Sequence, residues 1–237
     1  MFERVVDGVP LRFHLAGINN QNFLMRDEQT GTYWQQITGL AISGPLKGRK
    51  LNLIAAEELS FRLWKEEEPN GTVLQDVPGR ERDYSAPDWD QRMARVPVVI
   101  SYAQAGIKAR DLMLGVTAFG SSRAFPYATV LKEQLVQDQI GSEPVLLVVG
   151  PDGRSVRVFR RKLPRVSSDL QFYRLEDGNG LFMDAGTGSR WNFHGCAISG
   201  QWKGACLEQV STMKDYWFDW RNYHPDTSVY GVRQRIH

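Results

Sequence analysis

The 237-residue sequence has little cysteine, no long apolar run and almost no net charge. Its two cysteines, Cys196 and Cys206, are too few for a disulfide framework. We expect them to be buried free thiols, with a pairing across a hairpin as the alternative. No apolar stretch approaches the ~20 residues of a membrane-spanning helix. The formal charge of +2 predicts neither a nucleic-acid partner nor an anionic membrane.

The first residues also lack a secretion signal. A signal peptide has a basic segment followed by an apolar core, and residues 1–13 (MFERVVDGVPLRF) have neither. We therefore expect a cytoplasmic protein as the sequence is written, or an exported one if a leader precedes it. The P-loop, the dinucleotide fingerprint and the Gly-x-Ser-x-Gly elbow are missing as well, so no cofactor is predicted. The composition is typical of a soluble globular protein.

What the sequence does contain is a repeat. Residues 27–51 (DEQTGTYWQQITGLAISGPLKGRKL) align with residues 184–207 (DAGTGSRWNFHGCAISGQWKGACL), with 12 identities in 24 columns when one residue is skipped near Thr38. Composition alone would give about one or two. The match continues at a constant offset of 156 to Trp64 and Trp220. We interpret the chain as an internal duplication.

Each copy predicts a β-meander followed by a helix. Short runs rich in β-branched and aromatic residues alternate with glycine-containing turns in both copies. Helices are predicted over residues 56–65 and 213–221, the second capped by Ser211 or Thr212, and each should pack on its own meander. The predicted fold is therefore α+β and β-rich, with duplicated meander-plus-helix units packed into one globule.

The chain divides into three predicted parts. Residues 1–75 form a first, shortened repeat unit, and residues 76–110 form a linker with a connecting strand at residues 96–100. Residues 111–237 form a second, longer unit. The extra segment of this second unit includes a predicted amphipathic helix over residues 130–136.

Three segments resemble a known family. They are TGTYWQQITGLAISGPLKG at residues 30–48, LGVTAFGSSRAFPYATVLKEQLVQDQIGSEPVLLVV at residues 114–149 and WRNYHPDTSVYG at residues 220–231. They are similar to the bacterial and archaeal domain-of-unknown-function family 3179. The resemblance covers nearly the whole chain and implies two family units in tandem, the first truncated at its N-terminus.

The resemblance implies little about activity, because the family is named for lacking one. Members often carry an export signal or a lipid anchor, and they commonly carry a Cys-x-x-Cys pair. The corresponding position here reads Gly150-Pro151-Asp152-Gly153, an ordinary turn. A metal or redox role that depends on that pair is therefore not implied for this chain.

The preferred polar site lies in two equivalent turns, residues 44–48 and 200–204. Each turn combines glycines with a lysine and follows a serine, a set that can hold a phosphate or sulfate through backbone N–H groups. Ordinary hairpin turns are the favoured alternative. The candidate residues are Ser43, Lys47, Ser199 and Lys203.

Three further residues are candidates for binding. We expect Trp202 to be exposed at its turn tip, where an indole can stack on a sugar ring or a protein partner. Asp27 and Asp184 occupy equivalent turns, and a pair brought together by pseudo-twofold symmetry could share a proton or bind a cation. An Asx turn at each position is the favoured interpretation.

The soft-metal candidates are His194, Cys196, Cys206 and His224. His194 and Cys196 would point to one face of a strand, because strand side chains alternate, and zinc uses such ligands. Their spacing matches no zinc signature, so metal binding is the less favoured interpretation.

These observations favour a ligand-binding or interaction module with a site at or near the junction of the two repeats. Its partner would be a small ligand, a glycan or a protein. One alternative is an enzyme of unspecified reaction with Asp, His or Lys residues in the cleft between the repeats. A degenerate metal-binding protein is the second alternative, and the oligomeric state is left open.

Overall fold

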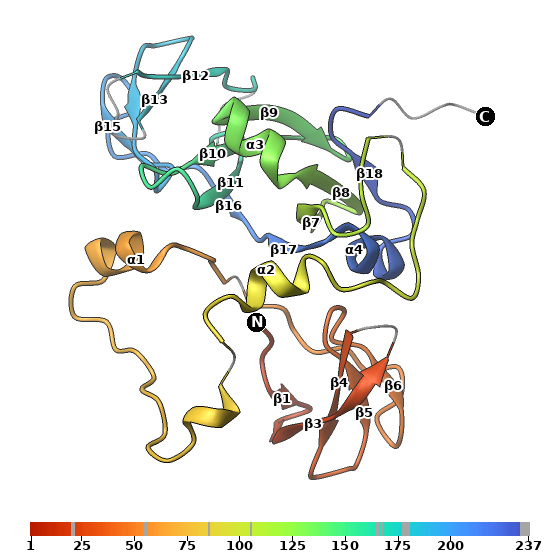
Figure 1. The fold of residues 1–237 in the computed structure, drawn as a ribbon. Coiled ribbons are helices and arrows are strands. Elements are labelled where there is room, and N and C mark those ends of the chain that lie inside the picture. The colour runs from red at the N-terminus through yellow and green to blue at the C-terminus, as the bar shows by residue number, and fades with distance from the viewer. Residues whose placement is uncertain are drawn as a thin grey trace.

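The computed structural model describes residues 1–19, 22–54, 56–84, 86–104, 106–164, 166, 168–176 and 181–232. Its described strands form four four-stranded sheets and one hairpin. Figure 1 shows a β-meander on either side of a set of central strands. The chain is α+β and β-rich, as predicted.

The first meander follows a short hairpin. The hairpin pairs β1 (Val5–Val6) with β2 (Val9–Pro10), and the antiparallel meander contains β3 (Phe13–Asn19), β4 (Asn22–Asp27), β5 (Tyr33–Gln35) and β6 (Ala41–Ser43) in that order. The meander has a small core of its own, which consists of Leu11, Trp34, Ala41 and Leu51.

The second meander repeats this strand order. It contains β12 (Phe172–Arg174), β13 (Phe182–Asp184), β14 (Arg190–Trp191) and β15 (Ala197–Ser199). A Cβ on Gly44 would lie 2.7 Å from the Thr32 Cα, and one on Gly200 would lie 2.6 Å from the Ser189 Cα. Real Cβ atoms do not approach so closely, so both turns require the glycine that the two copies share.

The central strands form two sheets that α3 (Tyr127–Glu133) packs against. One sheet has the order β16 (Gln209–Val210), β11 (Val156–Arg160), β10 (Glu143–Val149) and β9 (Leu135–Ile140). The other has the order β17 (Met213–Tyr216), β7 (Leu112–Ala118), β8 (Ser121–Pro126) and β18 (Ser228–Val229). Strand β18 pairs with β8 in parallel. Strand β18, near the end of the described chain, therefore lies in the same sheet as β7 and β8, which come about a hundred residues earlier.

The helices α1 (Phe61–Glu67) and α4 (Trp217–Tyr223) stand at equivalent places in the repeat. Both begin later than predicted. Ser60 caps α1, since its Oγ accepts from the Leu63 N–H at 3.3 Å. Residues 213–216 are not helical, because they pair with β7 and complete its sheet. Ser211 and Thr212 therefore cap no helix.

The prediction that each helix packs on its own meander is wrong. Leu63 of α1 packs with Phe159 of β11 and Trp191 of the second meander. Trp217 and Trp220 of α4 pack with buried residues of β7 and β8. The first-repeat helix thus lies on the second meander.

The connecting region contains η1 (Glu81–Asp83) and α2 (Trp89–Met93), neither of which buries a residue. No strand forms at residues 96–100. The predicted helix at residues 130–136 instead ends at Glu133, because Gln134 adopts a positive φ of 65° before β9 begins. The longest described helices have seven residues, far fewer than the ~20 that cross a bilayer.

Candidate functional site

A hollow of about 860 Å³ lies where the first meander meets the central strands and α4. We call it the junction hollow. On the first-meander side it is lined by Leu53 and Ile54, which are 53% and 42% exposed although they are large and apolar. On the other side it is lined by Leu114 of β7, Met213 of β17 and Trp220 of α4. Three parts of the chain that lie far apart in sequence therefore enclose one space.

Lys50 and His224 lie together in the lining of the junction hollow. The His224 ring stacks on Trp220 with 3.8 Å between centroids, and its Nδ1 lies 3.1 Å from the Trp220 carbonyl oxygen. A carbonyl only accepts, so Nδ1 carries the proton and Nε2 of the neutral ring remains an acceptor. Burial lowers the pKa of His224, and the charge of Lys50 also lowers it, against the effect of the carbonyl hydrogen bond.

The other charges of the junction hollow leave it with a positive excess. Glu58 pairs with Lys214, and Glu57 pairs with Arg157 outside the hollow at 2.7 Å. Lys50 and Arg154 also line the hollow, and neither forms a salt bridge within the described residues. The positive charges of Lys50 and Arg154 would therefore attract an anionic group into the junction hollow.

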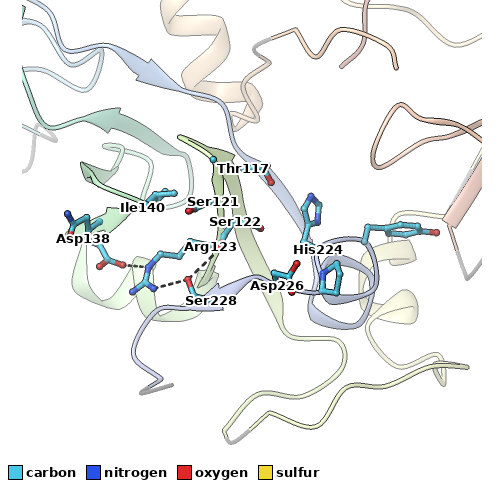
Figure 2. A pocket seen from close by; sticks show the side chains of 14 residues that line it. Thr117, Ser121, Ser122, Arg123, Asp138, Ile140, His224, Asp226 and Ser228 are labelled. Carbon is cyan, nitrogen blue, oxygen red and sulfur yellow. Dashed lines mark hydrogen bonds and ion pairs between the residues drawn. The ribbon is translucent and has the colours of Figure 1, made fainter. Parts of the chain in front are cut away.

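A second, polar hollow of about 810 Å³ surrounds Arg123 of β8. Figure 2 shows its guanidinium between Asp138 of β9 and Ser228 of β18, at 2.5 Å and 3.0 Å respectively. These contacts join three strands, so Arg123 stabilises the sheet structure here. His224 lines this hollow as well as the junction hollow.

The two predicted lysine turns, at residues 44–48 and 200–204, follow β6 and β15, which belong to different sheets. The Lys47 N–H donates to the Gly44 carbonyl at 3.1 Å, and the Lys203 N–H donates to the Gly200 carbonyl at 3.2 Å. These backbone groups are therefore already bonded, as in ordinary hairpin turns. Anion binding by the lysines stays a prediction. Of the candidate side chains, Ser43, Lys47 and Lys203 are exposed and Ser199 is half-buried.

Trp202 is not an exposed indole. Its side chain packs against the core of the second meander and is half-buried. Its backbone N–H donates to the Ser189 Oγ at 3.1 Å. The side chain therefore contributes to the core and is only partly exposed, and stacking on a sugar ring or a protein partner stays a prediction.

Asp27 and Asp184 are fully buried at equivalent places. Each accepts from the backbone N–H three residues ahead and from a tryptophan Nε1, Trp34 at 2.8 Å and Trp191 at 3.1 Å. Burial raises the pKa of Asp27, but these hydrogen bonds outweigh it and lower the pKa below the usual value. Asp27 belongs to β4 and Asp184 to β13, and Figure 1 shows the two meanders on opposite sides of the central strands. Each carboxylate has the geometry of a turn cap.

Cys196 and Cys206 form a disulfide with their Cα atoms 4.0 Å apart. They occupy facing positions of an antiparallel bridge, which Leu40 and Lys50 occupy in the first meander. The expectation of free thiols is therefore wrong, because this pairing places the two side chains side by side. A disulfide sulfur is no thiolate and offers a metal no charged ligand.

The histidines of the soft-metal set lie against different partners. His194 lies 3.3 Å from Arg157 and 3.4 Å from Glu67, whereas His224 directly follows α4 and stacks on Trp220. Among the described residues no three His, Cys, Asp or Glu side chains are arranged to hold a metal ion. Neither histidine hydrogen-bonds to a serine or threonine hydroxyl in that part of the chain, so no nucleophile–base pair is formed there.

The sequence pattern does not reveal two acidic residues, Asp219, which is buried, and Asp215, which is half-buried. Burial and repulsion from Asp219 raise the pKa of Asp215 to about 7, and burial raises the pKa of Asp219. The two aspartates are four residues apart, and the helix predicted over residues 213–221 would place them on one face, where an i, i+4 pair is usually solvated. The sequence pattern gives Lys50 no role either, because in the repeat it is only the residue that aligns with Cys206.

Comparison with known proteins gives a family but no activity. A family model described as "Protein of unknown function (DUF3179)" matches residues 1–227. Searches of the curated proteins and of the solved structures found no significant match. The match includes both meanders, both repeat helices and all the central strands except β18. The chain therefore belongs to the DUF3179 family of proteins of unknown function.

Proposed function

We propose that the protein binds a small amphipathic molecule in the junction hollow. The ligand would place an apolar body against Leu53 and Ile54 and an anionic end beside Lys50. The observation that carries the proposal is the exposure of two large apolar side chains, 53% and 42%, inside a hollow of about 860 Å³. Ligand pockets are typically ~300–1,000 Å³ and mostly apolar with a few placed polar groups.

The charge of the lining supports an anionic end. Lys50 and Arg154 have no salt-bridge partner among the described residues, and the lowered pKa of His224 leaves its ring neutral near pH 7. A ligand carboxylate or sulfonate would be attracted by the two cations. It would also raise the pKa of His224 toward its usual value, because a nearby negative charge favours the protonated ring.

A binding role is favoured over an enzymatic one. Catalysis by a hydroxyl nucleophile needs a base within hydrogen-bond reach, and the described histidines have no such contact. The lysine turns are not included in the proposal because their backbone N–H groups bond internally. A small ligand is favoured over a glycan or protein partner because the apolar surface is recessed.

The proposal is tested by titrating the protein with anilinonaphthalene sulfonate, a fluorescent probe with an apolar body and an anionic end. We expect saturable binding at one site that Leu53→Asp abolishes, because a carboxylate would face the probe's apolar rings. Leu15→Asp is the matched control, since Leu15 is a 64% exposed leucine of β3 that does not line the hollow. Equal binding by both variants would contradict the proposal.

A further inference from the structure

A cluster of buried oxygens lies where the first meander meets α4. It is formed by Asn22 of β4, Asp215 of β17 and Asp219 in the first turn of α4. The Asn22 Nδ2 donates to the Asp219 Oδ2 at 2.9 Å. Asp219 acts electrostatically on Asp215, and both act on Tyr223. The three side chains therefore share one neighbourhood.

Each of the three side chains keeps one buried oxygen without a hydrogen-bond donor among the described residues. These atoms are Asn22 Oδ1, Asp215 Oδ2 and Asp219 Oδ1. Asn22 is only 9% exposed and Asp219 only 6%. Native proteins pair nearly all buried polar atoms with protein, water or an ion. Three unpaired oxygens in one neighbourhood indicate a partner that is not part of the chain.

The described side chains bring no positive charge to this cluster. Neither Asp215 nor Asp219 forms a salt bridge with a lysine, arginine or histidine of the described residues. Arg110 lies over the rings of Tyr216 and Phe218, at 5.1 Å and 5.0 Å, and its Nε donates to the Val96 carbonyl. Two buried carboxylates without a counter-charge are unfavourable.

We propose that Asn22, Asp215 and Asp219 bind a hard divalent cation of the Mg²⁺, Mn²⁺ or Ca²⁺ class. Two carboxylates match the charge of such an ion, the amide oxygen is a neutral third ligand, and water completes the shell. An all-oxygen set selects hard ions over zinc or copper. Asp215 also lines a hollow of about 1030 Å³, which gives the ion a path from solvent.

The ion would join β4 of the first meander to the start of α4. It would replace the missing counter-charge and add a bond between two parts of the chain that otherwise meet there through the Asn22–Asp219 hydrogen bond. Cation binding should therefore stabilise the protein against heat, because a ligand that binds only the folded state raises Tm.

The test titrates the chelator-treated 237-residue protein with MnCl₂ and measures free Mn²⁺ by its electron paramagnetic resonance signal. We expect one bound equivalent and a raised Tm. Asp219→Asn should weaken binding at least about tenfold, and Asn22→Asp should tighten it, because ligand charge sets the affinity of such sites. Asp226→Asn removes an exposed carboxylate of the same C-terminal segment and should leave binding unchanged.

Two results would overturn the proposal. One is the absence of Mn²⁺ binding by folded wild-type protein up to about 1 mM, the weak end of protein cation sites; the unpaired oxygens would then hold protons or water. The other is equal binding by the wild type, Asp219→Asn and Asn22→Asp, which would place the ion elsewhere. Circular dichroism of each variant shows whether it is folded, and Asn22→Asp still tests the site if Asp219→Asn unfolds.

Discussion

Arg157 of β11 donates from Nη2 to the Glu67 carboxylate of α1 at 2.8 Å. Its side chain is only 4% exposed, and it also donates to both oxygens of Glu57 at 2.7 Å. The guanidinium lies 4.4 Å from the centre of the Phe193 ring. The hydrogen bonds from Arg157 lower the pKa of Glu57. A single buried cation therefore fixes the first-repeat helix to the central strands.

Replacing Arg157 with alanine should lower the free energy of unfolding by about 3–5 kcal/mol, because two carboxylates lose their buried partner. Arg160→Ala is the matched control. Arg160 also pairs with two glutamates, Glu143 and Glu208, but its side chain is 32% exposed, so its loss should cost less than about 1 kcal/mol. Urea unfolding of both variants measures the difference. Equal losses would show that the Arg157 cluster is no stronger than a surface pair.

Reduction of the Cys196–Cys206 disulfide should destabilise the protein by about 2–3 kcal/mol. The bond closes a short loop, with a sequence separation of 10 residues, and loop closure of that size restricts the unfolded chain by roughly this amount. The cysteine double variant Cys196→Ser/Cys206→Ser should match the reduced wild type. A thiol assay under denaturing conditions should find no free thiol before reduction, and reactive thiols at that stage would contradict the pairing.

The buried caps Asp27 and Asp184 should be equally important to their meanders. Asp27→Ala and Asp184→Ala each leave a buried tryptophan Nε1 without its acceptor, Trp34 in one case and Trp191 in the other. Each should lose about 1–3 kcal/mol. Asp7→Ala, which removes an exposed pair with Arg49, is the control and should change stability little. Chemical denaturation compares the three, and a negligible effect of either cap variant would argue against the capping role.

Asp152 should make stability fall at low pH. Burial raises its pKa, but hydrogen bonds from Ser155, Ser60 and two backbone N–H groups outweigh burial and lower the pKa to about 2. A carboxyl with a depressed folded-state pKa stabilises above its unfolded value, here 3.8, and this contribution is lost as the pH falls toward 2. Unfolding measured across that interval should show a smaller loss for Asp152→Asn than for the wild type. Parallel curves for the two proteins would contradict the assignment.

The sequence predicts those parts of the fold that depend on residues close together in the chain, namely the strands and turns of the two meanders. The alternating runs and shared glycines located both meanders, and the requirement for Gly44 and Gly200 follows from backbone contacts within each meander. The helix predicted at residues 213–216 does not form, because the pairing of these residues with β7, about a hundred residues earlier, overrides local preference.

The candidate site was harder to predict because its walls come from separate parts of the fold. Leu53 and Trp220 line the same hollow, yet no spacing in the sequence relates them. The placement of α1 on the second meander depends on Leu63 fitting a core built by later strands. Equivalent residues in a repeat can therefore share local geometry and still have different neighbours.

The most direct test of the account compares two probes with nearly the same apolar skeleton. Anilinonaphthalene sulfonate carries an anionic group, and phenylnaphthylamine is uncharged. If the junction hollow binds an apolar body beside Lys50, wild-type protein should bind both, and Lys50→Gln should weaken the sulfonate by about three- to tenfold, since a partly exposed charge contact is worth about 1 kcal/mol. The affinity of the Lys50→Gln variant for phenylnaphthylamine should equal that of the wild type. Wild-type protein that binds neither probe, or a Lys50→Gln variant that binds the sulfonate as tightly as the wild type, would contradict the account.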